Sequence, residues 1–380
     1  MTHIDIAAQK NHIYRLEDFM SIKDEWIELH ANSEAQSPLL SFEHVNLWYQ
    51  CFAIPDEVRI YRATEGDHTI GFLPLVLSRK AQVRILSSLT NQHCFHSEPL
   101  VRLGYEAIFP KRILESLFLD KSLWDVFQHR FSYSFSPLPG LFSDELLSHR
   151  NADWLRNIQP TYLVTLEKPF HKYISSDLRP KVHKTIRQYK NRLAKAGNSC
   201  FEHHQGDEAV AQWNNLVTIE DSGWKGEAAT SLKRIGDSSQ RYYQGFVQLL
   251  AKKQALHIFF LKLDNKAIAG AFGYVEGDTF HFAKGGYDEQ FRRLSPSVLL
   301  FMFMVEHIMA NLPEIKRIHL FPWDYGFKHR FANAETFCME TIIYGETMRG
   351  KMVQLYSNVK RKLKPLCRRR ALTVSFASTK

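Results

Sequence analysis

One stretch of the chain combines glycines, two arginines and a helix start in an order that suits an anion. Residues 284–288 (KGGYD) end a predicted strand, Arg292 and Arg293 follow in a turn, and residues 295–297 (SPS) open a predicted helix. Ser295 is a favourable N-cap, and proline is well tolerated at the first helical position. The start of a helix presents unsatisfied N–H groups and the positive end of its dipole, so we expect a pyrophosphate cradle here. The alternative is an ordinary capped helix with surface arginines.

A second stretch, residues 318–331, runs from a predicted strand through a turn dense in aromatic, acidic and basic groups into a short helix. Loops at strand ends often hold functional side chains, because the scaffold beneath them is rigid. Asp324 has the carboxylate needed to take a proton from an amine, and Lys328 can pair with an anion. Trp323 and Tyr325 are candidate substrate contacts. The alternative is that Asp324 caps the helix and the aromatic rings belong to the core.

A third stretch, residues 220–226 (EDSGWKG), lies at the end of a predicted helix. Glu220 and its neighbour Asp221 are candidates for acid or base chemistry. Trp224 is suited to wall a pocket, and Lys225 beside it is a second candidate substrate contact. The alternative is a helix that ends at a glycine and is anchored by its tryptophan.

Several common catalytic and cofactor motifs are absent from the sequence, among them G-x-S-x-G, H-E-x-x-H, C-x-x-C, the Walker loop and G-x-G-x-x-G. Residues 93–96 (HCFH) form the only cluster of histidine and cysteine, and we interpret them as loop or core because no second ligand pair lies nearby. We therefore predict no metal site. The five cysteines have no paired spacing, which fits a reducing cytoplasm.

The elements that must position these groups occur in a similar order in both halves of the chain. With 380 residues, the chain exceeds the size that one hydrophobic core usually supports, so two domains are expected. Each half is predicted to have helices first, then an antiparallel hairpin, then a helix and more strands, which indicates a duplicated α/β unit. The main predicted hairpin strands are 58–63 and 69–77 in the first half, and 256–263, 267–274 and 279–287 in the second.

The net charge of +9 comes from one end of the chain. Residues 346–380 contain ten lysines and arginines and one acid, whereas the first 345 residues contain 39 of each sign. The body is therefore neutral, which argues against a nucleic-acid cradle. In the tail, apolar residues recur at helical spacing, as expected for a helix that lies on an anionic membrane. The alternative is that this apolar stripe packs on the second domain.

Together these segments resemble the CelD/BcsL-type acetyltransferase family of the GNAT superfamily. The likeness includes the basic helix at 187–193, the segment 222–226, the hairpin at 264–269, the 286–296 segment and the 325–328 turn, and it extends to 70–75 in the first half. It covers roughly residues 10–345. The sequence departs from the family pattern at His319 and at Pro322 or Trp323, where the family usually has an acid and a glycine.

The resemblance implies an α/β fold with mixed sheets, built from two tandem GNAT-like acyltransferase domains of Fem-like plan and a basic C-terminal helical tail. The expected boundaries are 1–168 for a degenerate, acceptor-shaping domain, 169–345 for the acyl-CoA-binding domain and 346–380 for the tail. The implied activity is transfer of an acetyl or other acyl group from acyl-CoA to an amine, on a small molecule or on a cell-envelope or polysaccharide precursor.

The resemblance also implies roles for individual residues. Arg292, Arg293, Leu294, Ser295, Ser297 and Val298 would bind the co-substrate, acetyl-CoA or another acyl-CoA, at the helix start. The thioester carbonyl would meet N–H groups near the end of the 279–287 strand, where Tyr287 lies. Asp324 or Glu220 would take the proton of the acceptor.

Two other functions are compatible with the sequence. One is a Fem-like transferase that uses aminoacyl-tRNA, with the basic helix at 179–195 and the tail as RNA contacts, although the neutral body favours it less. The other is a non-catalytic protein that binds a membrane surface. The expected location is the cytoplasm, with peripheral contact to the inner membrane face through the tail. The sequence leaves the acyl chain, the acceptor and the oligomeric state open.

Overall fold

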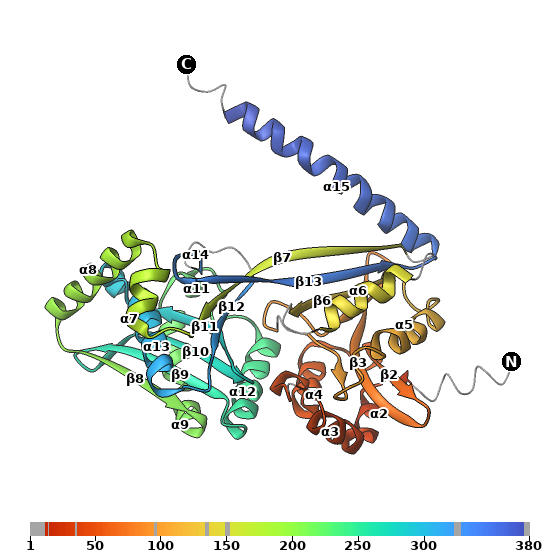
Figure 1. The fold of residues 1–380 in the computed structure, drawn as a ribbon, viewed down its shortest axis with the longest axis horizontal. Helices are drawn as coiled ribbons and strands as arrows, with labels where there is room; N and C mark the ends of the chain where they lie inside the picture. The colour runs from red at the N-terminus through yellow and green to blue at the C-terminus, as the bar shows by residue number, and fades with distance from the viewer. Residues whose placement is uncertain are drawn as a thin grey trace.

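The computed structural model describes residues 12–13, 15–34, 36–94, 97–133, 137–148, 153–322 and 328–375. They form two lobes joined by two long strands (Figure 1). One mixed sheet runs through both lobes in the order β1-β2-β3-β4-β6-β13-β7-β12-β11-β10-β9-β8, with β5 paired to β3. The predicted α/β class with mixed strands is therefore confirmed.

The first lobe packs helices on a mostly antiparallel set of strands. Its strands are β1 (His12–Ile13), β2 (Val58–Glu65), β3 (His68–Lys80), β4 (Val83–Ser88), β5 (Leu100–Val101) and β6 (Val126–Tyr133). Its helices are α2 (Leu16–Ser21), α3 (Lys23–Ala31), η1 (Pro38–Leu40), α4 (Phe42–Phe52), η2 (Pro55–Glu57), α5 (Phe109–Leu119) and α6 (Leu138–Ser148). Ser41 caps α4, since its side chain accepts a hydrogen bond from the His44 N–H.

The second lobe repeats this plan, with helices packed on a second set of mixed strands. Its strands are β8 (Ser199–Gln205), β9 (Leu256–Leu263), β10 (Lys266–Glu276), β11 (Thr279–Tyr287) and β12 (Arg317–Pro322). Its helices are α7 (Phe170–Lys172), η3 (Tyr173–Asp177), α8 (Pro180–Ala196), α9 (Gly206–Ala211), α10 (Trp213–Asp221), α11 (Trp224–Glu227), α12 (Asp237–Lys252), η4 (Glu289–Leu294), α13 (Pro296–Asn311) and α14 (Lys328–Phe331). The three predicted hairpin strands of this half are confirmed within a few residues.

Two long strands exchange partners between the lobes. β7 (Asp153–Thr165) follows the first half of the chain, yet its C-terminal end pairs with β12 of the second lobe. β13 (Ala334–Tyr344) ends the second half, yet it pairs with β6 of the first lobe. The two strands also pair with each other over their full length. The predicted domain boundaries at 168/169 and 345/346 remain predictions, and the sheet shows that each half completes the other.

A shared apolar core also joins the lobes. Helix α4 of the first lobe packs on α12 of the second, and Trp26, Tyr49, Tyr242 and Phe246 belong to the same buried cluster. Within it, His44 Nε2 and the Tyr242 hydroxyl lie 2.9 Å apart. Because a buried polar pair is costly to separate, this contact favours one fixed arrangement of the lobes.

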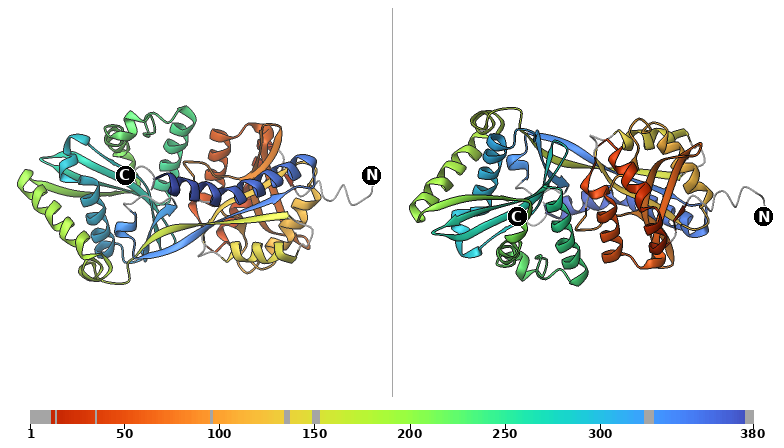
Figure 2. Two further views of the ribbon diagram at one scale, coloured as in Figure 1. Left: turned by 90° about the horizontal axis from the view of Figure 1, so that it is seen from above. Right: turned by 90° about the horizontal axis from the view of Figure 1, so that it is seen from below.

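The chain ends in a long helix, α15 (Met348–Ser375), which starts at the end of β13. The helix rises away from the two long strands and runs back above the joint between the lobes (Figures 1 and 2). No described helix is both long and apolar enough to cross a membrane.

Apolar side chains lie on the exposed surface of α15, next to exposed basic residues such as Lys351 and Lys360. Met352, Leu355 and Tyr356 are 68%, 66% and 66% exposed, whereas the polar Gln354 and Ser357 on another side are partly buried. The alternative in which the apolar stripe packs on the second domain is therefore wrong for the described part of the helix.

Candidate active site

The candidate site forms where two parallel strands separate. β11 and β12 pair over only three residues, 279–281 with 317–319, and β11 then continues to Tyr287 without β12. Its other neighbour, β10, changes register there: Phe272 lies opposite Lys284, and Gly273 lies opposite Phe282. Ala283 is therefore an extra residue in β11, which is a β-bulge. Bulges leave a residue unpaired in the ladder and are frequent beside active sites.

A cavity of about 220 Å³ lies beside this part of β11. Its walls come from β10, β11, α13 and the end of α10, namely Glu220, Gly223, Lys225, Gly270, Ala271, Phe282, Gly285, Gly286, Tyr287, Ser297, Leu300 and Phe301. Most of these residues are small or apolar. A Cβ on Gly286 would stand 2.7 Å from the Cα of Glu220, so glycine is needed for α10 to approach the strand. The predicted residues Glu220, Lys225, Tyr287 and Ser297 meet in this one cavity.

Glu220 is buried and held from both sides. Lys225 Nζ donates to its Oε1 at 2.8 Å and also to the Gly285 carbonyl oxygen at 2.8 Å. The backbone N–H of Leu232 donates to the other carboxylate oxygen. Breaking a buried, hydrogen-bonded ion pair is strongly destabilising. Glu220 therefore fixes Lys225 and the adjoining loop against β11.

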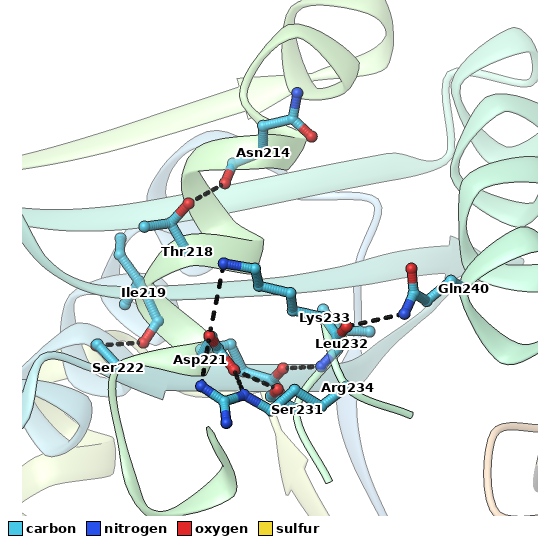
Figure 3. Close-up of polar contacts among 11 residues, drawn as sticks. Asn214, Thr218, Ile219, Asp221, Ser222, Ser231, Leu232, Lys233, Arg234 and Gln240 are labelled. Carbon is cyan, nitrogen blue, oxygen red and sulfur yellow. Dashed lines mark hydrogen bonds and ion pairs between the residues drawn. The ribbon is translucent and has the colours of Figure 1, made fainter. Parts of the chain in front are cut away.

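The neighbouring Asp221 is part of the loop's support. Its carboxylate accepts hydrogen bonds from Ser231 Oγ at 2.6 Å and Arg234 Nε at 2.8 Å (Figure 3). Hydrogen bonding by Ser231 and Arg234 lowers the pKa of Asp221. Gln240 at the start of α12 holds the same loop through the Lys233 carbonyl oxygen (Figure 3). These contacts give Asp221 a structural explanation, and they tie α10 to α12.

Lys284 is a candidate that sequence reasoning did not single out. It follows the bulged residue directly, and its Nζ lies 5.2 Å from the ring centroid of Tyr243 on α12. Burial lowers its pKa to about 8, with the Glu220 carboxylate raising it and the Lys225 ammonium lowering it further. A lysine with a pKa near neutrality can exchange protons at physiological pH. The sequence does contain a signal for this residue, because Lys284 is a charged residue inside a predicted strand, between Phe282 and two glycines.

A small cavity on the other side of Ala283 lies between the lobes. Its volume of about 20 Å³ suits about one water molecule. It is lined by Leu39, His93 and Cys94 of the first lobe, and by Tyr242, Tyr243, Phe246, Tyr274, Ala283 and Phe321 of the second.

His93 joins the first lobe to this cavity. Its Nε2 lies 2.9 Å from Ser239 Oγ, and its Nδ1 lies 3.5 Å from the Tyr243 hydroxyl. Burial and, to a smaller extent, nearby Lys284 together lower the pKa of His93 to about 4, so the ring is neutral at pH 7. His93 and Cys94, which the sequence suggested to be loop or core residues, also line a cavity beside the bulge.

Two buried histidines hold the point where the strands separate. His281 Nδ1 and His319 Nδ1 lie 3.3 Å apart, and His319 Nε2 lies 2.8 Å from Thr161 Oγ1 on β7. Burial keeps the pKa of His281 well below its usual value. His319, where the resembling family usually has an acid, thus links β11, β12 and β7.

The helix start differs in detail from the sequence prediction. Ser295 occupies the N-cap position of α13 in a left-handed conformation (φ 53°), and its side chain makes no cap hydrogen bond. The expected side-chain cap is therefore wrong. The Val298 N–H donates to the Ser295 carbonyl oxygen at 3.1 Å, so the turn itself uses that donor. Val298 is buried, and Leu294 packs against the core.

The two predicted arginines lie in η4, just before this turn. Arg292 and Arg293 are exposed. Asp288 caps η4 by accepting a hydrogen bond from the Gln290 N–H, and it pairs with Lys266 at 2.8 Å. The position of the arginines is therefore fixed relative to the hairpin below.

The remaining predicted residues divide into three groups. Lys328 is buried in α14 and donates to the Phe321 carbonyl oxygen at 2.6 Å, and it is not among the residues that line the cavity beside Gly286. Tyr287 does line that cavity, and burial raises its pKa, as does its hydrogen bond to Glu289. Trp323, Asp324 and Tyr325 lie outside the described residues, as does the side chain of Trp224. Within the described part of the chain, no group of three or more potential ligands is arranged to hold a metal.

Comparisons with known proteins found a matching family model and solved structures with a similar fold. Residues 180–329 match the model of a family described as an acetyltransferase (GNAT) domain. The fold is similar to the crystal structure of FemX, with 10% identity, a TM-score of 0.52, and coverage of 83% of this chain and 95% of that one.

A second solved structure with a similar fold is described as the C-terminal domain of a lysylphosphatidylglycerol synthetase from Agrobacterium fabrum. It has 13% identity, a TM-score of 0.53, and coverage of 90% of this chain and 96% of that chain. No curated protein matches the chain. The family match and the shared fold support an acyltransferase with a GNAT-type fold, as the sequence predicted.

Proposed function

We propose that the chain is an acyl-CoA-dependent N-acyltransferase of the CelD/BcsL type, which transfers an acetyl or other acyl group to an amine. One observation carries the proposal: the bulge in β11 has a cavity on each side, with Lys284 next to it. In acyl transfer the acceptor amine must reach the carbonyl carbon of the donor thioester from a side that the donor itself does not occupy. A strand with a cavity on each side meets that need.

The larger cavity suits the donor. Gly285 and Gly286 leave the β11 backbone accessible at its wall, while Phe282, Leu300 and Phe301 make it apolar. An extended thioester arm would lie along this backbone. N–H groups of the bulged segment would then stabilise the negative charge that develops on the carbonyl oxygen, as in an oxyanion hole.

Lys284 suits the role of proton acceptor. An amine must be neutral to attack, and a lysine with a pKa of about 8 is partly neutral at physiological pH. The amine nitrogen would bond to the carbonyl carbon, the carbon–sulfur bond would break, and the proton would pass to Lys284. The leaving CoA thiolate would finally be protonated. Glu220 and Lys225 would adjust the charge of Lys284 rather than react themselves.

The acceptor would enter between the lobes. The small cavity there holds about one water molecule, so a bound amine would have to displace side chains such as Tyr243 or Phe321. We propose an amine of a small molecule, or of a cell-envelope or polysaccharide precursor, as the acceptor class.

A ligand panel tests this function. Acetyl-CoA and longer acyl-CoA thioesters are expected to raise the melting temperature, because a ligand that binds only the folded state stabilises it. The best donor is then combined with amine acceptors, and release of CoA thiol is followed. If no acyl-CoA shifts the melting temperature, the proposal is wrong.

The tail supports a membrane-surface location for this activity. The exposed stripe of Met352, Leu355, Tyr356 and Val359 lies in the same segment as ten lysines and arginines, a combination that suits an anionic bilayer. Vesicles with phosphatidylglycerol should sediment the full chain, whereas vesicles of phosphatidylcholine should not. The matched variant Leu355→Ser with Tyr356→Ser keeps every charge and should lose most of this binding. Equal sedimentation of the variant and the wild type would exclude the stripe as the contact.

A further inference from the structure

An open groove lies where the end of α8 meets η4. It has a volume of about 520 Å³ and is lined by Arg192, Lys195 and Ala196 of α8 and by Arg293 and Leu294 of η4. The two elements are far apart in the sequence, and the fold brings them together on the outer end of the second lobe, where α8 lies in Figure 1. Sequence reasoning treated the α8 arginines and lysines as a separate basic helix. The fold adds them to the predicted co-substrate site.

The groove is strongly cationic. Three of its five lining residues carry a positive charge, and none of the five is acidic. From Arg179 to Lys195 the chain has seven lysines and arginines and no acid. Lys190 is paired with Glu306 at 3.7 Å, whereas Arg192, Lys195 and Arg293 point exposed side chains at the groove. Such a cluster favours a ligand with concentrated negative charge, and arginine favours phosphate above all.

The groove lies close to the cavity beside Gly286. Leu294 lines the groove and Ser297 lines the cavity. Two residues lie between them in the chain, so their Cα atoms are at most about 11 Å apart. The capped turn at Asp288 and its ion pair with Lys266 hold η4 in place between the two. One elongated molecule can therefore occupy both.

We propose that this groove binds the 3′-phosphate of the acyl-CoA donor, with Arg192 and Lys195 of α8 as its specific contacts. The inference rests on the proposed function. Coenzyme A is a chain of thioester, pantetheine arm, diphosphate and 3′-phosphoadenosine. With the thioester at the bulge and the arm in the apolar cavity, the diphosphate passes the 293–297 turn and the terminal phosphate reaches α8. A phosphate monoester carries about −1.5 to −2 charges at pH 7, which suits two cations from one helix.

The test compares binding of CoA with binding of 3′-dephospho-CoA, which differs only in that phosphate. The wild type is expected to bind CoA about 10-fold more tightly, because charge-assisted hydrogen bonds of this kind are lost with the phosphate. Arg192→Glu and Lys195→Glu are each expected to weaken CoA binding by about 10-fold or more and to leave dephospho-CoA binding unchanged. Lys181→Glu is the matched control, because it makes the same charge change at an exposed position near the other end of α8.

Three outcomes would overturn the inference while leaving the proposed function intact. They are equal wild-type affinity for both ligands, equal weakening of both ligands by Arg192→Glu, and an effect of Lys181→Glu as large as that of Arg192→Glu. Loss of tRNA binding in the groove variants, with CoA affinity unchanged, would also overturn it and would assign the groove to RNA. If neither CoA nor dephospho-CoA binds the wild type, the proposed function itself fails.

Discussion

Each lobe contains a parallel strand pair of three residues, and in the second lobe a cavity of about 220 Å³ lies beside the strand that extends past this pair. In the first lobe, residues 85–87 of β4 pair with 126–128 of β6. In the second lobe, residues 279–281 of β11 pair with 317–319 of β12. β4 ends one residue after its pairing, whereas β11 continues for six more residues and contains a bulge. The length of one strand beyond its pairing therefore distinguishes the lobe with the candidate site.

The helix that lies in the chain between the two strands of each pair strengthens the contrast. In the first lobe, α5 begins with Phe109, which is fully buried, and its ring lies 2.5 Å from where a Cβ on Gly71 would stand. In the second lobe, α13 begins with Pro296 and Ser297, and Ser297 lines the cavity. A large ring packs on the strand in one lobe, and a small polar residue leaves space in the other. The same plan thus gives close packing in one lobe and the wall of a cavity in the other.

The largest expected effect is a loss of stability at acidic pH. Its measurement also tests whether the two lobes, despite this difference, unfold as one unit. His44 and His129 lie in the first half and His257 in the second, and burial lowers the pKa of each to about 4. In the unfolded chain a histidine has a pKa near 6.5, so acid protonates the unfolded state first. Stability is therefore complete above about pH 6.5 and falls as the pH drops toward 4, by roughly 3 kcal/mol for each such histidine.

Urea unfolding between pH 7 and pH 4.5, followed by tryptophan fluorescence and far-UV circular dichroism, measures this loss. The shared sheet predicts one transition with one midpoint in both signals. His171→Gln, at an exposed position, is the control and should leave the pH dependence unchanged. Two separate transitions would show that the lobes are independent.

Phe109→Ala removes the ring that packs on Gly71. We expect the free energy of unfolding to fall by about 3–5 kcal/mol, the usual cost of a buried phenylalanine. The affinity for acetyl-CoA should not change, because the first lobe is proposed to bind no donor. Phe337→Ala, at a position 51% exposed, should cost less than about 0.5 kcal/mol. A small loss of unfolding free energy in Phe109→Ala would mean that the packing of this ring on Gly71 does not stabilise the first lobe.

Lys284→Met tests the proposed role of Lys284 as the proton acceptor in the second lobe. We expect kcat to fall about 100-fold, in the usual range for loss of an acid–base group, with the donor Kd unchanged. Wild-type activity should rise as the pH passes about 8, because Lys284 must be neutral to accept a proton, and the variant should lose this rise. Lys80→Met, at the exposed end of β3, is the control in the first lobe. An unchanged pH profile in the Lys284 variant would contradict its role.

Ser297→Phe places a large ring at the start of α13, as Phe109 does in the first lobe. The cavity of about 220 Å³ would be partly filled, and we expect the donor Kd to rise about 10-fold. Ser297→Ala keeps the space and should bind the donor as the wild type does. Isothermal titration with acetyl-CoA measures both, and tight binding by the phenylalanine variant would place the donor elsewhere.

Much of the fold was predictable from the sequence because its signals are local. The predicted strands 256–263, 267–274 and 279–287 match β9, β10 and β11 within a few residues, because short apolar runs between turn residues are a local signal. The predicted meeting of Glu220, Lys225, Tyr287 and Ser297 also follows from their places at the ends of neighbouring elements.

The remainder depends on contacts between distant segments. The bulge at Ala283 is visible only as a change in register against β10, and the lowered pKa of Lys284 depends on burial beneath Tyr243. His93 reaches the site from the other lobe, 150 residues from Tyr243 in the chain. Strand β8 and the first half of β7 were not predicted, since β8 is polar and only partly buried and so has no clear alternation.

The exchange of β7 and β13 has a consequence for synthesis on the ribosome. The chain emerges from its N-terminus, so β6 and β7 are made long before β13, which ends at Tyr344. Until then β6 has an unpaired edge, and unpaired strand edges promote aggregation. The first lobe can complete its sheet only when nearly the whole chain has been made. Folding of the N-terminal half is therefore a late event in the life of the nascent chain, and a messenger truncated before codon 334 would yield a product with an open sheet edge.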